Sequence, residues 1–255
     1  MKRMVVKVGT NVLADRKGAI DYKIMENFVR DIAEIRKKCR EILIVTSGAI
    51  GAGMSELGIE KRPSDIKMQQ ACAAVGQSIL ISKYREIFGK YGIKVAQILL
   101  TYDDFSDKKA EINMGNSIST LLGLGVVPII NENDPISINE LGPSFGDNDN
   151  LSAMVACRVK ADALIILTSV DGLYDKDPSS KGAKIIHEVN NFDSFIGSLE
   201  GASDGLGIGG IKTKIAAAKL AASCGIKTII ANGTKAGILG DLMNGKKAGT
   251  VFRPK

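Results

Sequence analysis

Short apolar runs alternate with helical patterns along most of this chain, and polar or glycine-rich turns separate them. A strand covered by helices on both faces appears as such a continuous apolar run, and its alternation with helices is typical of a mostly parallel sheet. The sequence therefore predicts an α/β fold, a three-layer αβα sandwich around a mostly parallel central sheet. The expected strands cover residues 4–8, 41–46, 94–100, 126–130, 163–167, 184–189, 227–231 and 250–252.

Helices are expected between these strands. Asp21 is a suitable N-cap for a helix whose apolar residues, from Ile24 to Ile35, recur at helical spacing. The small residues at positions 47–53 are expected to form a turn. Further helices are expected over residues 66–91, 111–122, 151–159, 211–224 and 238–243.

Length and charge narrow the class of protein. A chain of 255 residues is long enough for one large α/β domain or two small ones. The net charge of +6 is spread along the chain and only 5% of residues are aromatic, which disfavours a nucleic-acid surface and fits anionic small ligands. No segment reaches the ~18 apolar residues of a membrane span. The first residues lack the apolar core of a signal peptide, so a cytoplasmic location is expected.

Cysteine and histidine offer little chemistry in this sequence. Cys39, Cys72, Cys157 and Cys224 lie far apart without a C-x-x-C pair, and each sits in an apolar or helical pattern. All four are expected to be reduced core thiols. His187 is the single histidine, which excludes a histidine-rich metal site, and the G-x-S-x-G motif of serine hydrolases is absent from the sequence.

The polar turns after the strands are expected to meet in one crevice, because ligands of open α/β sheets bind outside the carboxyl ends of the strands. Lys7 interrupts an otherwise apolar run there, and a buried lysine is rare unless it is paired. Either Lys7 faces the crevice or its strand is an edge strand that exposes it to solvent. Residues 146–150, G-D-N-D-N, either orient cations, a metal or a polar molecule, or form an Asx-rich turn that caps a helix.

Residues 205–210, G-L-G-I-G-G, formally match G-x-G-x-x-G, but no clear strand precedes them and Ile211 stands where a Walker A motif needs lysine. Glycines before a helix start still suit phosphate. Lys212 and Lys214 fall in the first turn of the expected helix, where the helix dipole disfavours cations, so an anion between them and the helix is indicated. The alternative is a flexible loop before an alanine-rich helix.

Seven segments, in order across nearly the whole chain, resemble the amino-acid kinase family. They are V-V-K-V-G-T (5–10), I-V-T-S-G-A-I (44–50), A-A-V-G-Q (73–77), P-I-I-N-E-N-D (128–134), G-D-N-D-N-L-S-A (146–153), D-G-L-Y (171–174) and G-x-G-G-x-x-T-K (207–214). The N-E-N-D and G-D-N-D-N pair resembles the branch whose acceptor is glutamate. The resemblance implies a single amino-acid kinase domain over residues 1–255, without the C-terminal PUA domain of many members. Ser169 replaces the usual aspartate after Thr168.

The resemblance implies that ATP, with Mg²⁺ held mainly by the nucleotide, phosphorylates the side-chain carboxylate of L-glutamate. This reaction gives L-glutamyl 5-phosphate in the first step of proline synthesis, and a glutamyl phosphate reductase would act next. Asp149 would hold Lys7 and Lys214 as the catalytic cluster, and no protein ligand for the metal is named. The implied nucleotide contacts are Lys7, Gly9, Thr168, Ser169, Ile208, Gly209, Gly210, Ile211, Lys212, Thr213 and Lys214. The implied glutamate site is Ser47, Gly48, Asp134, Asp147 and Asn148.

Regulation and assembly are also implied by the resemblance. Proline is expected as a feedback inhibitor at a site overlapping that of glutamate, with residues 131–146 as the regulatory loop, and a homodimer or homotetramer is expected. Two alternatives stay open. One is a kinase of the same fold with another acceptor, and the other is a non-catalytic sensor of glutamate or proline.

Overall fold

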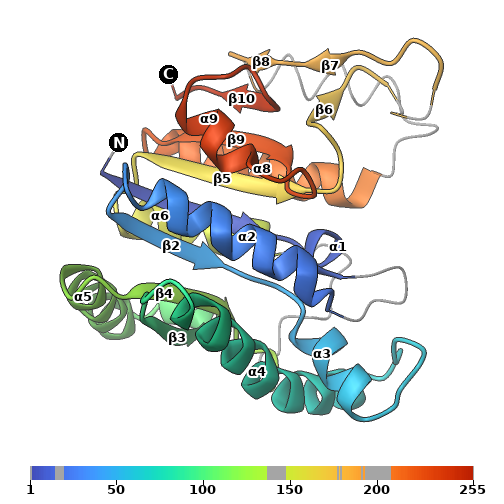
Figure 1. The fold of residues 1–255 in the computed structure, drawn as a ribbon, viewed down its shortest axis with the longest axis vertical. Coiled ribbons are helices and arrows are strands. Elements are labelled where there is room, and N and C mark those ends of the chain that lie inside the picture. Colours follow the sequence, from blue (N-terminus) through green and yellow to red (C-terminus); the bar gives the residue numbers. More distant parts are fainter. Residues whose placement is uncertain are drawn as a thin grey trace.

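The computed structural model describes residues 2–14, 20–136, 148–176, 178, 180–190, 192 and 208–254. Its centre is an eight-stranded sheet with the order β3-β4-β2-β1-β5-β9-β10-β8 (Figure 1). The six strands from β3 to β9 run parallel, which confirms the predicted mostly parallel sheet. The bounds are β1 (Arg3–Val8), β2 (Glu41–Val45), β3 (Val95–Leu100), β4 (Val127–Glu132), β5 (Ala163–Thr168), β8 (Glu188–Val189), β9 (Lys227–Asn232) and β10 (Thr250–Phe252).

Helices cover both faces of the sheet, as the sandwich architecture predicts (Figure 1). Because successive side chains of a strand point to opposite faces, β1 serves two cores: Val6 and Val8 pack into one cluster and Val5 into the other. The first core also takes residues from α2 (Tyr22–Ile35), α4 (Ile66–Gly89) and α9 (Ile238–Met243). The second takes residues from α5 (Lys108–Gly123), α6 (Asp149–Arg158) and α8 (Ile208–Ser223).

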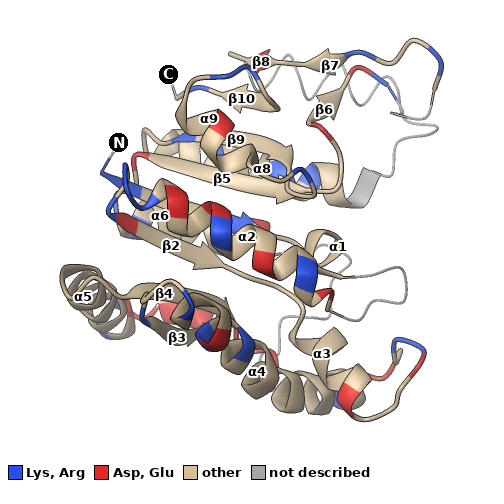
Figure 2. Cartoon of the chain, viewed as in Figure 1, with Lys and Arg blue, Asp and Glu red and all other residues tan. Residues whose placement is uncertain are grey.

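The surfaces of these helices are mixed in charge. In Figure 2 basic and acidic segments are interspersed along α2 and α4 rather than gathered by sign. Within the described part of the chain, no helix combines the length and the apolar character needed to cross a bilayer.

The prediction of a turn at residues 47–53 is wrong, because α3 (Ala49–Glu56) begins there. Its small residues let two helices approach closely. A Cβ atom at Gly53 would lie 1.8 Å from the carbonyl oxygen of Cys72 on α4, and one at Gly76 would lie 1.8 Å from that of Ala49. Gly53, one of the residues that suggested a turn, is therefore a contact point of the α3–α4 pair.

Short elements complete the fold. The chain leaves β1 through a one-turn helix, α1 (Thr10–Leu13), and η1 (Asp103–Phe105) precedes α5. The strand expected over residues 184–189 is divided at His187 into β7 (Ile185–Ile186) and β8, which join different sheets. β7 pairs antiparallel with β6 (Leu173–Tyr174), a strand that was not predicted.

The prediction of four reduced thiols is wrong for one pair. Cys157 and Cys224 form a disulfide with a Cα–Cα distance of 5.6 Å, whereas Cys39 and Cys72 are buried free thiols. Cys157 lies near the end of α6 and Cys224 directly after α8, which pack side by side on the second core. Their sequence separation of 67 residues hides this neighbourhood.

We expect loss of this disulfide to lower the free energy of unfolding by about 2–4 kcal/mol, because the cross-link restricts the unfolded chain. Urea unfolding of wild type and Cys157→Ser without reductant measures the difference. In dithiothreitol the two proteins should unfold alike. Equal stability without reductant would contradict a stabilising cross-link.

Candidate active site

Lys7 lies inside the protein near the carboxyl end of β1. Because β1 pairs with β2 on one side and β5 on the other, the alternative of an edge strand that exposes Lys7 is wrong. The side chain is 1% exposed, and its Nζ lies 2.8 Å from Oδ1 of Asp149. The Lys7 side chain therefore lies on the face of the sheet that carries the second core, and it has a charged partner there.

Asp149 is the first residue of α6 and is fully buried. Its Oδ2 accepts hydrogen bonds from Lys214 Nζ at 2.9 Å and from the Thr213 hydroxyl at 3.1 Å. A carboxylate in the first turn of a helix is favoured by the helix dipole. Lys214 also donates to the carbonyl oxygen of Gly210 one turn earlier, at 3.1 Å. Asp149 thus links a strand end to the beginning of α8.

This cluster of Lys7, Asp149 and Lys214 carries two positive charges and one negative charge in a buried region. Burying ions costs several kcal/mol each, and apolar residues of similar volume often give a more stable protein. Such a group is therefore better explained by function than by stability. The excess positive charge of the cluster suits an anion.

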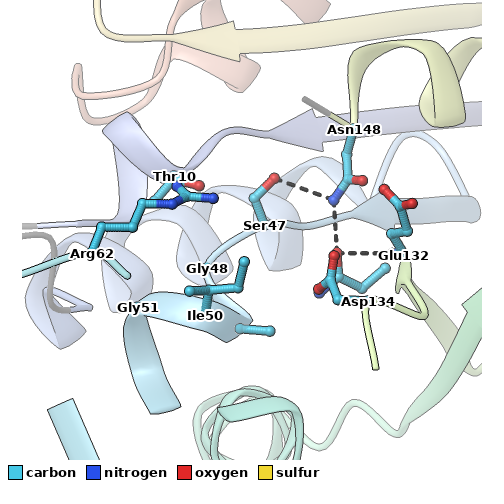
Figure 3. A pocket seen from close by; sticks show the side chains of 11 residues that line it. Thr10, Ser47, Gly48, Ile50, Gly51, Arg62, Glu132, Asp134 and Asn148 are labelled. Atoms are coloured by element: carbon cyan, nitrogen blue, oxygen red, sulfur yellow. Dashed lines mark hydrogen bonds between the residues drawn. The ribbon is translucent and has the colours of Figure 1, made fainter. Parts of the chain in front are cut away.

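Figure 3 shows a cavity, here called the Ser47 cavity, whose lining includes Asn148, the residue before Asp149. Asn148, the N-cap residue of α6, does not cap the helix with its side chain. Its amide instead donates to Oδ1 of Asn131 at 2.7 Å, to the Ser47 hydroxyl at 3.3 Å and to the carbonyl of Thr46. The described residues that line this cavity are Thr10, Ser47, Gly48, Ala49, Ile50, Gly51, Arg62, Asn131, Glu132, Asp134 and Asn148.

Thr46, the residue before Ser47, has a buried hydrogen-bond partner on α4. Thr46 Oγ1 is 2.9 Å from the hydroxyl of Tyr84 on α4, and burial raises the pKa of Tyr84. Gly48 adopts φ +109°, a backbone conformation that is strained for residues with a side chain. It is also the N-cap residue of α3. The first turn of α3 consequently faces the cavity through Ala49, Ile50 and Gly51.

The Tyr174 cavity lies on the other side of the cluster and is more apolar. Its described lining residues are Asn11, Thr168, Val170, Gly172, Leu173, Tyr174, Pro178, Gly210, Ile211, Lys214 and Ile230. The loops beside it are tied together by Asp171, which accepts from Asn232 at 2.8 Å and pairs with Lys235 at 2.7 Å. The hydrogen bond from Lys235 is the main cause of the lowered pKa of Asp171, and the hydrogen bond from Asn232 is the second cause.

Residues adjacent in sequence connect the two cavities with each other and with the charged cluster. Neighbouring residues divide between them: Thr10 lines the Ser47 cavity and Asn11 the Tyr174 cavity. In the same way Asn148 faces the Ser47 cavity, while Asp149 binds Lys214 of the Tyr174 cavity. Of the two ammonium groups, Lys214 lines the Tyr174 cavity directly, whereas Lys7 is buried behind Asp149.

The structure brings most of the expected site residues together. Ser47, Gly48, Asp134 and Asn148 line the Ser47 cavity, and Thr168, Gly210, Ile211 and Lys214 line the Tyr174 cavity. Gly9 lies next to Lys7, since a Cβ atom there would be 3.3 Å from Lys7 Nζ.

Other expected nucleotide residues lie elsewhere. Ser169 and Lys212 are exposed and line neither cavity, and Thr213 bonds to Asp149 instead. Because α8 begins at Ile208, Lys212 and Lys214 lie in its second turn, so their predicted place in the first turn is wrong. Ile208 and Gly209 belong to α8, whereas Asp147 lies outside the described residues.

Sequence reasoning missed several lining residues. Asn131 and Glu132 stand in the N-E-N-D segment and Tyr174 in D-G-L-Y, so the quoted motifs contained the signal. Arg62 had no signal of this kind. It lies in the loop between α3 and α4 and reaches the cavity only through the packing of these helices.

Sequence comparison places these observations in a family. The model of the amino acid kinase family matches residues 2–232. A glutamate 5-kinase of Caldanaerobacter subterraneus subsp. tengcongensis is 47% identical over 254 residues, which cover 99% of this chain and 68% of the relative. A glutamate 5-kinase of Clostridium acetobutylicum is 43% identical over 257 residues, with 100% of this chain and 96% of the relative covered.

The fold is also found in solved structures. Carbamate kinase from Giardia lamblia bound to AMP-PNP superposes with a TM-score of 0.69 at 17% identity, covering 100% of this chain and 99% of that chain. At this identity the likeness concerns the fold alone.

We expect Asp149→Asn to lower the free energy of unfolding by about 3–5 kcal/mol, because it leaves buried ammonium groups without their carboxylate. Chemical denaturation measures the change. The matched control is Glu34→Gln, which removes the acid of an exposed pair with Lys37 and should cost at most about 1 kcal/mol. Equal effects of the two variants would show that the cluster is not electrostatically coupled.

Proposed function

Because the chain belongs to the amino acid kinase family, we propose that it transfers the γ-phosphoryl group of ATP to the side-chain carboxylate of L-glutamate. The products are ADP and L-glutamyl 5-phosphate, the first intermediate of proline synthesis. The single observation that carries the proposal is the Lys7–Asp149–Lys214 cluster between two cavities. The two relatives given above are named glutamate 5-kinases, and on this basis we propose glutamate as the acceptor.

The acceptor needs no general base. A glutamate side chain has a pKa of about 4.3, so it is ionised at neutral pH and is already a nucleophile. Phosphoryl transfer depends on positioning and charge neutralisation rather than on covalent chemistry by the protein. The glutamate carboxylate and the nucleotide phosphates repel each other as they approach. The ammonium groups of Lys7 and Lys214 reduce this repulsion.

The Tyr174 cavity suits a nucleotide. Leu173, Tyr174 and Ile230 offer apolar surface for a base. Gly210 lies in the first turn of α8, where helix geometry favours phosphate, and Lys214 adds a positive charge one turn later. Asp149 already binds two lysines, so we place Mg²⁺ on the phosphate oxygens and water, as this ion keeps much of its hydration. When bound there it neutralises part of the phosphate charge.

The Ser47 cavity would then hold glutamate. Gly9 lies next to Lys7 and Gly48 lines this cavity, so their backbone N–H groups are candidates to meet a developing charge. Asp134 and Asn148 offer polar contacts for the backbone end of the amino acid.

An acceptor panel tests the proposed reaction. With ATP and Mg²⁺, ADP release and hydroxamate trapping should be greatest with L-glutamate, compared with aspartate, N-acetylglutamate and carbamate. Because the γ-carboxylate must reach the cluster, the shorter aspartate is expected to be a poor acceptor. Activity with another acceptor alone would indicate a different kinase of this fold. Glutamate or proline binding without ADP release would indicate a sensor. Parallel assays with proline measure feedback inhibition.

The phosphoryl clamp is tested by Lys7→Ala and Lys214→Ala. Each should lower kcat by about 100-fold or more, the size expected when a preorganised transition-state donor is lost. The control is Lys37→Ala, which removes an exposed lysine far from the cluster in sequence and should leave kcat unchanged. Thermal unfolding verifies that each variant is folded. Near-normal kcat in both site variants would reject the clamp.

A further inference from the structure

We propose that Arg62 binds the α-carboxylate of the amino-acid acceptor and so helps to determine which acceptors the enzyme accepts. The proposal rests on the proposed function, because it deepens the assignment of the Ser47 cavity to glutamate. Arg62 belongs to none of the motifs that carry the family resemblance.

Arg62 is the one lysine or arginine among the described residues that line the Ser47 cavity. In Figure 3 its guanidinium group extends over the cavity beside Thr10, while Asp134 and Asn148 lie on the opposite side. Its backbone position is set by the close contact of α3 with α4 at Gly53 and Gly76.

The guanidinium group of Arg62 forms no hydrogen bond or ion pair with another described residue. Two other arginines of the described chain do have acidic partners: Arg3 lies 2.7 Å from Glu41 and Arg158 lies 3.4 Å from Glu111. Asn131 lines the same cavity, and its buried Nδ2 also has no acceptor among the described residues. The exposed guanidinium of Arg62 is thus a donor at this cavity whose acceptor is not supplied by the described part of the chain.

The charges of the cavity match those of an amino acid. An α-amino acid carries a carboxylate and an ammonium group on one carbon atom. Arg62 offers a planar guanidinium that binds a carboxylate through two parallel hydrogen bonds. The acidic side chains of Glu132 and Asp134 line the same cavity and suit the ammonium group.

The charged cluster cannot serve the α-carboxylate as well. Lys7 and Lys214 are needed at the reacting γ-carboxylate and the phosphoryl oxygens, and both are held by Asp149. A substrate with two carboxylates therefore needs a second cation. Arg62 is outside the cluster, so the two carboxylates of one glutamate can be bound at separate places.

Steady-state kinetics with glutamate give the first test. Arg62→Ala should raise KM for glutamate by about 10-fold to 100-fold, the loss expected for a charge-assisted hydrogen bond. The kcat value and KM for ATP should change little, because the contact is equal in ground and transition states. Arg62→Lys keeps the charge and should restore part of the affinity. The matched control is Lys61→Ala, which removes the adjacent exposed cation and should leave every constant unchanged.

L-Isoglutamine gives the decisive test, because its α-carboxylate is a neutral amide while its γ-carboxylate is intact. In wild type, KM should be higher for isoglutamine than for glutamate by a factor similar to that of Arg62→Ala. In Arg62→Ala the two acceptors should have similar KM values, since the interaction is already lost. A purely structural role of Arg62 would raise KM for both acceptors alike and would overturn the proposal.

The two levels of inference fail separately. If wild type releases ADP with glutamate but Arg62→Ala has an unchanged KM, the Arg62 assignment is wrong and the proposed reaction stands. If wild type releases no ADP with glutamate, the proposed reaction is wrong, and the assignment of Arg62 to the α-carboxylate falls with it.

Discussion

The shared carboxylate of Asp149 is the interaction on which the site depends. It holds Lys7 at 2.8 Å and Lys214 at 2.9 Å, although the two lysines come from opposite ends of the chain. Like charges brought this close in a buried region repel each other strongly unless an acid lies between them. The acid thus creates a stable place with excess positive charge, which two reacting anions require.

The start of α6 gives consecutive residues different tasks. Asp149 turns toward the lysines, whereas Asn148 ties the Ser47 cavity together through Asn131 and Thr46. Asn148, the N-cap residue, uses its side chain for the cavity rather than to cap the helix. Two adjacent residues that the sequence also allowed as a plain helix cap therefore connect the Ser47 cavity with the charged cluster.

The sheet and most helices were predictable because their signals are local. Continuous apolar runs such as residues 163–167 identify buried strands without knowledge of their neighbours. The errors arose where contacts between residues far apart in the sequence determine the local structure. Gly53 looks like a turn residue until α3 meets α4, and Cys157 looks like a core thiol until α8 brings Cys224 beside it.

The sequence by itself determined the α/β class, the family and the unusual chemistry of Lys7, because a lone lysine in an apolar strand is visible without coordinates. Only the tertiary structure decided which groups meet. The neighbourhood of Lys7, Asp149 and Lys214, the division into two cavities and the approach of Arg62 all depend on how the sheet order and helix packing place distant residues in space. Sequence spacing carries no measure of such distances, because each follows from the whole packing rather than from any local pattern.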